Sequence, residues 1–186
     1  MEKDLLFDYF LFNLAKYQGS DLSRELEDIS MARIHNILFL VCLLEGLHLF
    51  QIFDKFEMYR NGPREVQLME RRRYDGESNY FRFNGRSFIY KGGEIRLPEE
   101  YQPLGARIVN SLDFIKNSGL MELNDTALQD FINEQSFKDR FYYYSNSRTN
   151  IGSVYSNDTR TMIEDRDKLK SNLRQLKLKH KQCIHL

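Results

Sequence analysis

The sequence predicts a mainly α protein, a single helical domain of six to seven helices with a small antiparallel β-meander inserted at about residues 79–97. Three observations predict this class. Of the 186 residues, 41% are hydrophobic, which is enough for one core in a chain of this length. Apolar residues recur every three or four positions along most of the chain, as on a buried helix face. Between residues 79 and 97 the period changes to two.

Two strongly apolar helices are predicted near the start of the chain. Residues 5–17 are apolar on several sides, which is typical of a helix buried by its neighbours, and Gly19 can end it. Residues 31–45 form the most hydrophobic stretch, and Ser30 before them is a favourable N-cap residue. We therefore expect residues 31–45 to be the central core helix, ended by Gly46.

The segment after this helix carries mixed signals. Residues 47–59 alternate partly like a strand and repeat partly like a helix, so their periodicity does not decide between the two. The tripeptide Asn61-Gly62-Pro63 breaks whatever precedes it, because proline disfavours helical geometry in the residue before it. Pro63 also suits the first position of a helix, so a short charged helix is expected over residues 64–73.

Alternating aromatic residues predict the inserted meander. Asn84-Gly85 suits a two-residue type I′ turn, which would place Phe81 opposite Phe88. Four aromatic side chains would then share one face of the hairpin: Phe81, Phe83, Phe88 and Tyr90. A second turn at Gly92-Gly93 is expected to lead into a further strand over residues 94–97.

The C-terminal half is predicted to be helical. Polar caps, glycines and apolar stripes predict helices at residues 105–118, 127–134, 137–144 and about 161–179. Asn124-Asp125-Thr126 caps the second of these, and the polar residues 145–159 are expected to form a mobile loop. We divide the chain into a helical domain, residues 1–160, and a basic helix and tail, residues 161–186.

No residue pattern indicates an enzyme, a bound cofactor or a metal site. The chain lacks the G-x-S-x-G elbow and the glycine-rich phosphate loops. Cys42 lies in an apolar helix, which would raise the pKa of its thiol. His35 lies within the predicted core helix without a second ligand at helical spacing, so we expect a buried neutral histidine. The tail residues His180, Cys183 and His185 could hold zinc or could be a frayed end.

Charge is balanced over the whole chain but not along it. Lys and Arg number 27, as do Asp and Glu, so nucleic acid is not the expected partner. Residues 160–186 nevertheless carry eight Lys or Arg against three acids. A helical nucleic-acid-binding regulator that uses this basic helix is therefore the alternative function.

Apolar runs and cysteines indicate the compartment. The longest apolar run, residues 37–44, is much shorter than the roughly 20 residues that span a membrane. The first residues lack the pattern of a signal peptide, and the two cysteines lie far apart. We expect a soluble, cytoplasmic protein with no membrane partner.

An aromatic run at residues 141–144 is a candidate interaction site. On the helix predicted there, three consecutive tyrosines cannot all point inward, so at least one is expected to be exposed. Tyr142 and Tyr143 are candidate partner-binding residues, because tyrosine supplies contact area at low entropic cost together with a polar tip. The alternative is that Phe141 and Tyr144 lie in the core and the other two cover its edge.

The core helix and the segment after it resemble a known family. A hydrophobic helix with RIHNILFL at residues 33–40 is followed by Leu49-Phe50 and then by FEMYRNGP at residues 56–63. This pattern, over about residues 5–75, resembles the Panacea domain. That domain is the SocA-like antitoxin domain of bacterial and phage toxin–antitoxin pairs, which includes phage-associated GepA-like proteins.

The resemblance implies a mostly helical, non-enzymatic protein without a cofactor. Such a protein binds a cognate protein toxin directly or, in some members, acts as a proteolytic adaptor. The matching motif supplies the candidate partner-binding residues Phe56, Tyr59, Arg60, Gly62 and Pro63. Pro63 would fix the backbone that presents Phe56 and Tyr59. The alternative is that Gly62-Pro63 is a tight connection between helices and Tyr59 is part of the core.

Overall fold

The structure is a computed structural model that describes residues 2–19, 29–59, 61–74, 78–84, 87–134, 141–145, 151–155 and 159–184. For residues 71–74, 141–145, 151–155, 159–162 and 179–184 it describes the backbone alone.

The described part of the chain is mainly helical, as the sequence predicts. Its α-helices are α1 (Glu2–Tyr17), α2 (Met31–Glu45), α3 (Leu47–Phe50), α4 (Val66–Tyr74), α5 (Gln102–Asn117), α6 (Asp125–Glu134) and α7 (Thr159–Ile184). Short 3₁₀ turns precede α5 and follow it, at Glu99–Tyr101 and Leu120–Glu122. The prediction of six to seven helices is thus confirmed.

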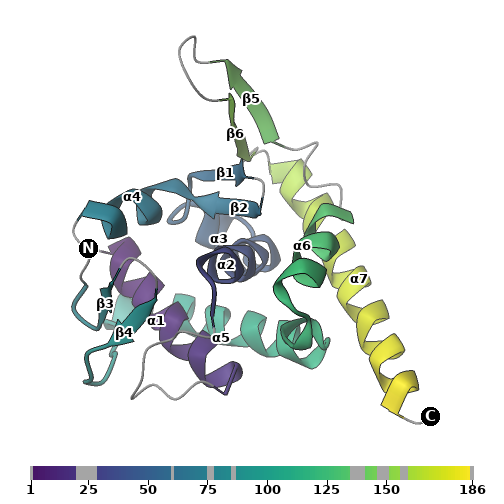
Figure 1. Cartoon of the computed structure of the whole chain (residues 1–186), viewed down its shortest axis with the longest axis horizontal. Coiled ribbons are helices and arrows are strands. Elements are labelled where there is room, and N and C mark those ends of the chain that lie inside the picture. Colours follow the sequence, from purple (N-terminus) through teal and green to yellow (C-terminus); the bar gives the residue numbers. More distant parts are fainter. Residues whose placement is uncertain are drawn as a thin grey trace.

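Helix α2 is the centre of the molecule. In Figure 1 it is seen nearly end-on, with α1 and α5 below it, two strands above it and α6 and α7 to its right. Every residue from Arg33 to Leu44 is buried, because a helix that is apolar on all sides needs neighbours on all sides. Its ends lie where the sequence places them. Ser30 Oγ accepts the Arg33 N–H at 3.1 Å, and Gly46 ends the helix with a φ of 65°.

Six short strands accompany the helices in the described residues. They are β1 (Phe56–Tyr59), β2 (Gly62–Glu65), β3 (Phe81–Phe83), β4 (Phe88–Tyr90), β5 (Phe141–Ser145) and β6 (Ile151–Tyr155). Four of them form one antiparallel sheet in the order β2-β1-β6-β5, in which the pair Glu57↔Val154 joins β1 to β6. The β5–β6 hairpin projects from the body at the top of Figure 1.

This sheet corrects three sequence predictions. Pro63 does not begin a helix, because β2 folds back on β1 and α4 begins only at Val66. The helix predicted over residues 137–144 is a strand from Phe141, in keeping with the preference of tyrosine for strands. The expected loop at residues 145–159 contains β6. The undecided segment, residues 47–59, contains both a short helix, α3, and a strand, β1.

The β3–β4 hairpin has its four aromatic residues on one face, but its register differs from the prediction. Phe81 pairs with Tyr90 and Phe83 pairs with Phe88, instead of Phe81 with Phe88. The cause is Asn84, whose N–H donates to the Ser87 carbonyl and whose Oδ1 accepts the Ser87 N–H. Hydrogen bonds between Asn84 and Ser87 therefore continue beyond the last strand pair, Phe83 with Phe88, and the shift of two residues preserves the face. The further strand predicted at residues 94–97 is absent from the described chain.

Helix α7 packs on the body of the protein. Leu169 and Leu173 are buried in the main core, and Leu176 packs against its edge. The helix is longer at both ends than the predicted residues 161–179. The other predicted helices begin slightly early: α5 at Gln102, and α6 at Asp125, where Asn124 Oδ1 accepts the Ala127 N–H. Within the described residues, no helix is long and apolar enough to cross a membrane.

Candidate protein-binding surface

The candidate surface is built on the β1–β2 hairpin, which contains the motif that resembles the antitoxin family. Phe56 at its base is only 1% exposed, and its ring contacts Phe39 and Phe50, with centroid distances of 5.2 and 5.9 Å. The Val66 N–H donates to the Lys55 carbonyl at 2.9 Å and closes the hairpin. Phe56 thus holds the hairpin on the core.

Gly62 brings the hairpin into close contact with α2. Its φ is 103°, and a Cβ atom there would lie 2.1 Å from Asn36 Oδ1 and 3.0 Å from Gln129 Oε1. Asn36 Nδ2 also donates to the Asn61 carbonyl at 3.3 Å. Only glycine combines this backbone conformation with this approach. Gly62 and Pro63 are both buried, so they position the hairpin.

Tyr59 is the exposed residue among the described candidate partner-binding residues of the motif. Its side chain is 41% exposed, and its Oη donates to Glu57 Oε2 at 3.3 Å. The Arg64 guanidinium lies over the ring, 5.6 Å from its centroid, which is a cation–π geometry. Partial burial and then the Glu57 carboxylate raise the pKa of Tyr59. The alternative that Tyr59 is a core residue is therefore wrong, whereas Arg60 lies outside the described residues.

The sheet connects this hairpin to the tyrosine run. Tyr142 pairs with Val154 and Tyr143 with Ser153 in the β5–β6 ladder, and Val154 also pairs with Glu57 of β1. Two segments that the sequence presents as unrelated candidates therefore belong to one sheet. The side chains of Tyr142 and Tyr143 are outside the described part, so the structure gives their register alone.

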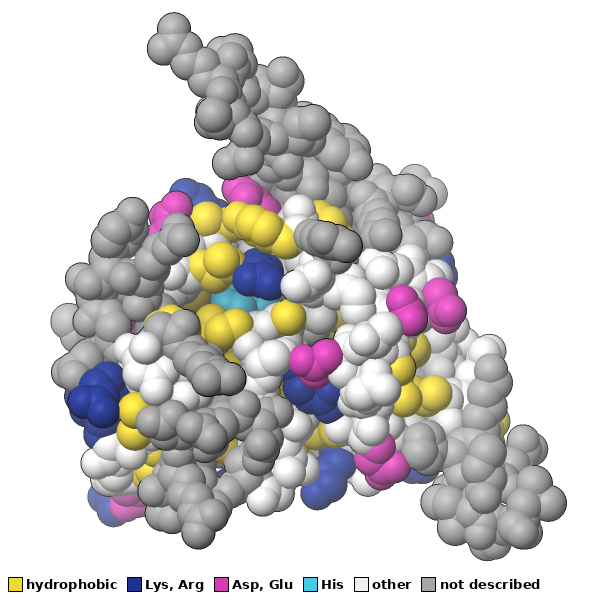
Figure 2. All heavy atoms as spheres, viewed as in Figure 1, with side chains coloured by type: hydrophobic (Ala, Val, Ile, Leu, Met, Phe, Trp, Pro, Cys, Tyr) yellow, Lys and Arg dark blue, Asp and Glu magenta, His cyan; other side chains and the backbone are white. Residues whose placement is uncertain are grey.

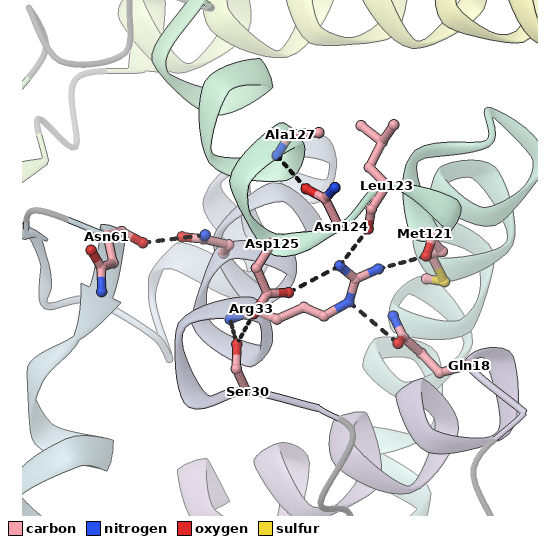
Figure 3. A network of polar contacts seen from close by, with 10 residues as sticks. Gln18, Ser30, Arg33, Asn61, Met121, Leu123, Asn124, Asp125 and Ala127 are labelled. Atoms are coloured by element: carbon pink, nitrogen blue, oxygen red, sulfur yellow. Dashed lines mark hydrogen bonds and ion pairs between the residues drawn. The ribbon is translucent and has the colours of Figure 1, made fainter.

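A buried arginine fixes the start of α2 under this surface. Figure 3 shows Arg33 at the centre of the network. Its guanidinium donates to the carbonyls of Met121 and Leu123, at 2.5 and 2.7 Å, and to Gln18 Oε1 and Asp125 Oδ1, both at 3.3 Å. These bonds tie α2 to the end of α1 and the start of α6. Arg33 is a structural residue that sequence reasoning missed, since a charge in an apolar helix gives no sign of its partners.

A partly buried polar cluster around Lys3 holds the other end of the hairpin. Lys3 Nζ donates to Asp54 Oδ1, Glu65 Oε1 and Gln67 Oε1, at 2.7, 2.7 and 2.6 Å. Glu65 is fully buried, and its Oε2 accepts the Leu68 N–H at 2.7 Å, which caps α4. Burial raises the pKa of Glu65 in spite of Lys3. The more exposed Asp54 has a lowered pKa: its partial burial raises the pKa, but the hydrogen bond to Lys3 and the charges of Lys3 and Lys55 together lower it further.

His35 lies directly beneath β2. It is fully buried, and its Nδ1 accepts the Glu65 N–H at 3.1 Å. Burial and then the Arg64 charge lower the pKa of His35 to about 3, so the expectation of a buried neutral histidine is confirmed. Burial likewise raises the pKa of the Cys42 thiol, which disfavours the reactive thiolate.

Among the described residues, no group of three His, Cys, Asp or Glu side chains could hold a metal ion. The side chains of His180, Cys183 and His185 fall outside that part.

The chain matches no protein-family model, no curated protein and no solved structure in the comparisons with known proteins. The resemblance to the SocA-like antitoxins therefore stays a prediction that rests on the residues of the α2 helix and of the β1–β2 hairpin.

Proposed function

We propose that this chain is a non-enzymatic protein-binding module that neutralises a cognate protein toxin, as SocA-like antitoxins do. The observation that carries the proposal is the single sheet that contains both the exposed Tyr59 and the tyrosine strand β5. The toxin is either blocked by direct binding or delivered to a protease by this chain acting as an adaptor.

The hairpin has the features of a preorganised anchor. Phe56 and Gly62 fix its backbone on α2, and Arg64 covers one side of the Tyr59 ring. A side chain that is already ordered loses little entropy on binding. Tyrosine and arginine are also the residue types that most often dominate the binding energy of an interface.

The β5–β6 hairpin extends the surface beyond the body. A stable interface covers about 800 Å² on each partner, which is more than one tyrosine can supply. A partner seated on Tyr59 would lie beside β6 and β5, because β6 is the next strand of the sheet after β1. Tyr142, in register with Val154 and Glu57, is therefore proposed as a further contact on the face of Tyr59, and Tyr143, the next residue of the strand, as a contact on the other face.

The proposal is tested by co-expression with the product of the adjacent gene. We expect growth rescue and co-purification, and we expect Tyr59→Ala to weaken binding by about 2 kcal/mol while the fold keeps its stability. Tyr101→Ala is the matched control, since Tyr101 is a partly exposed tyrosine in the 3₁₀ turn before α5. An adjacent gene whose product is not toxic, or rescue with neither association nor faster toxin degradation, would overturn the proposal.

Nucleic-acid binding is the second candidate, and one observation favours it. Lys168, Arg174 and Lys177 are exposed on α7. If they contact phosphates, a gel shift should weaken steeply as salt is raised, because binding releases counterions. We expect no shift at physiological salt. A robust, salt-sensitive shift that charge reversal at these three positions abolishes would make this function the better one.

A further inference from the structure

Two hydrogen-bond donors are buried where β2 crosses α2, and neither has an acceptor in the described part of the chain. They are His35 Nε2 and Arg64 Nε, both inaccessible to solvent. A buried donor without an acceptor destabilises the fold, so its presence calls for an explanation. Figure 2 shows a histidine and a Lys or Arg side chain over α2 and β2, within a patch of hydrophobic side chains.

The proton of His35 is assigned by its neighbour. A neutral imidazole has one donor and one acceptor nitrogen, and Nδ1 is the acceptor because it receives the Glu65 N–H. Nε2 must therefore carry the proton. Glu65 is itself held by Lys3 and by the Leu68 N–H, so the amide that fixes this tautomer cannot easily move.

Arg64 lies next to this donor on β2. Its strand neighbours Pro63 and Glu65 are buried, whereas Arg64 is half-exposed with its guanidinium over Tyr59. The N–H of the next residue, Glu65, donates to His35 Nδ1, so Arg64 is one residue along the strand from the contact with the imidazole. The two residues therefore bring two buried N–H groups without an acceptor to the contact between β2 and α2.

The charges around the pair select a singly negative ligand. The guanidinium contributes one positive charge and the neutral His35 contributes none. Glu65, the next residue of the strand, which is bound by Lys3, and Glu57, which pairs with Arg64 across the hairpin, are acidic. A dianionic phosphate would be repelled by these groups, whereas a carboxylate has one charge and two acceptor oxygens.

We infer that His35 and Arg64 form a subsite for a carboxylate, the side chain of an Asp or Glu residue of the partner that Tyr59 anchors. One carboxylate oxygen accepts from the Arg64 guanidinium, and the other accepts from His35 Nε2–H after the Arg64 side chain moves aside. The identity of the partner rests on the proposed function, but recognition of a carboxylate is a property of this chain alone.

The test uses the isolated, full-length protein and acetate as the probe. Nitrogen-15 NMR follows the His35 Nε2–H and Arg64 Nε–H resonances during titration with sodium acetate, and separately with acetamide and sodium chloride at matched ionic strength. We expect saturable shifts of both resonances with acetate over the millimolar range and none with the other two. Acetamide has the shape of acetate without its charge, so it separates carboxylate recognition from packing.

Variants locate the effect. Arg64→Gln should abolish the acetate shift at His35, whereas Arg96→Gln, the same change at an exposed arginine paired with Glu94, should preserve it. Absence of acetate shifts, equal shifts with acetamide or chloride, or persistence in Arg64→Gln would overturn the inference. A failure to find a toxin partner would overturn the proposed function and leave the acetate result unaffected, so the two failures are distinguishable.

Discussion

Two single residues, one in the β1–β2 hairpin and one beneath it, set the position of the hairpin on α2. Gly62 permits the close approach to Asn36, and His35 receives the hydrogen bond that fixes β2 on α2. Neither role is visible in the local sequence, where a glycine before a proline predicts a turn and a histidine in an apolar helix predicts a core residue.

Replacing Gly62 with alanine should destabilise the fold by about 3 kcal/mol, because the new Cβ atom meets Asn36 Oδ1 and the φ of 103° strains any other residue. Gly92→Ala is the control, since Gly92 has a φ of 93° with open space around it and should lose only about 1 kcal/mol. Chemical denaturation measures both. Equal losses would show that the contact with Asn36 is not tight.

His35 should make stability depend on pH. Its pKa is about 3 in the folded protein, against 6.5 for a histidine exposed to water as in the unfolded chain, so the folded protein binds fewer protons between these values. The stability from this group is complete above pH 6.5 and falls with pH, by about 2 kcal/mol between pH 6.5 and 5. Glu65, whose pKa is raised, acts in the opposite direction.

The contribution of His35 is separated from that of Glu65 by comparing the pH dependence of stability in wild type and in His35→Asn. In this variant the amide oxygen can still accept the Glu65 N–H. The variant should show a flatter fall of unfolding free energy over this range. Identical slopes would show that His35 titrates normally in the folded protein.

At the scale of elements, the fold depends on how three elements are attached to α2. The hairpin is attached through Phe56 and Gly62, α1 through Phe7, whose ring lies 6.4 Å from that of His35, and α7 through Leu169 and Leu173. The last attachment answers a question that the sequence leaves open, since a basic helix could equally lie on a partner.

Lys3 should matter far more than an ordinary surface lysine. Lys3→Met leaves the buried Glu65 without its cation and should cost about 3 kcal/mol at pH 7. The loss should shrink at lower pH, where Glu65 becomes protonated. Lys16→Met, at an exposed lysine over the Phe12 ring, should cost less than about 1 kcal/mol. Similar losses for the two variants, measured by urea denaturation, would contradict the role of the polar cluster around Lys3.

The docking of α7 predicts a contrast between its leucines. Leu169→Ala and Leu173→Ala should each lose about 2–5 kcal/mol, because both side chains are fully buried. Leu178→Ala, at a leucine that is 62% exposed, should stay within about 0.5 kcal/mol of wild type. Thermal and urea unfolding measure the stability of the three variants. Equal losses of unfolding free energy in all three would contradict the docking of α7 on the body.

At the scale of the whole molecule, the sequence predicts helices, whose signals are local, and misses strand pairing between segments that are distant in the chain. Residues 31–45 are assigned correctly because their apolar content and the caps at Ser30 and Gly46 are local signals. The sheet is missed because Glu57 pairs with Val154, from a segment whose polar composition is typical of a loop. Strand pairing over such a separation leaves no periodic trace in either segment.

The same limit applies to the candidate surface. Tyr59 and Tyr142 are identifiable as aromatic residues near turn signals, but their membership of one sheet depends on β6. Phe56, Gly62 and Pro63 are found by resemblance to a motif, and only their burial shows that they position the hairpin. Arg64 and Asn36 are missed, because their importance comes from what packs against them.

The most direct test of the central claim is hydrogen–deuterium exchange of the chain with and without the product of its adjacent gene. We expect partner-dependent protection of residues 56–65 and 141–155, the two hairpins of the sheet, with residues 163–178 of α7 unchanged. Protection confined to α7, or no protection by a partner that nevertheless co-purifies, would contradict a protein-binding surface on this sheet.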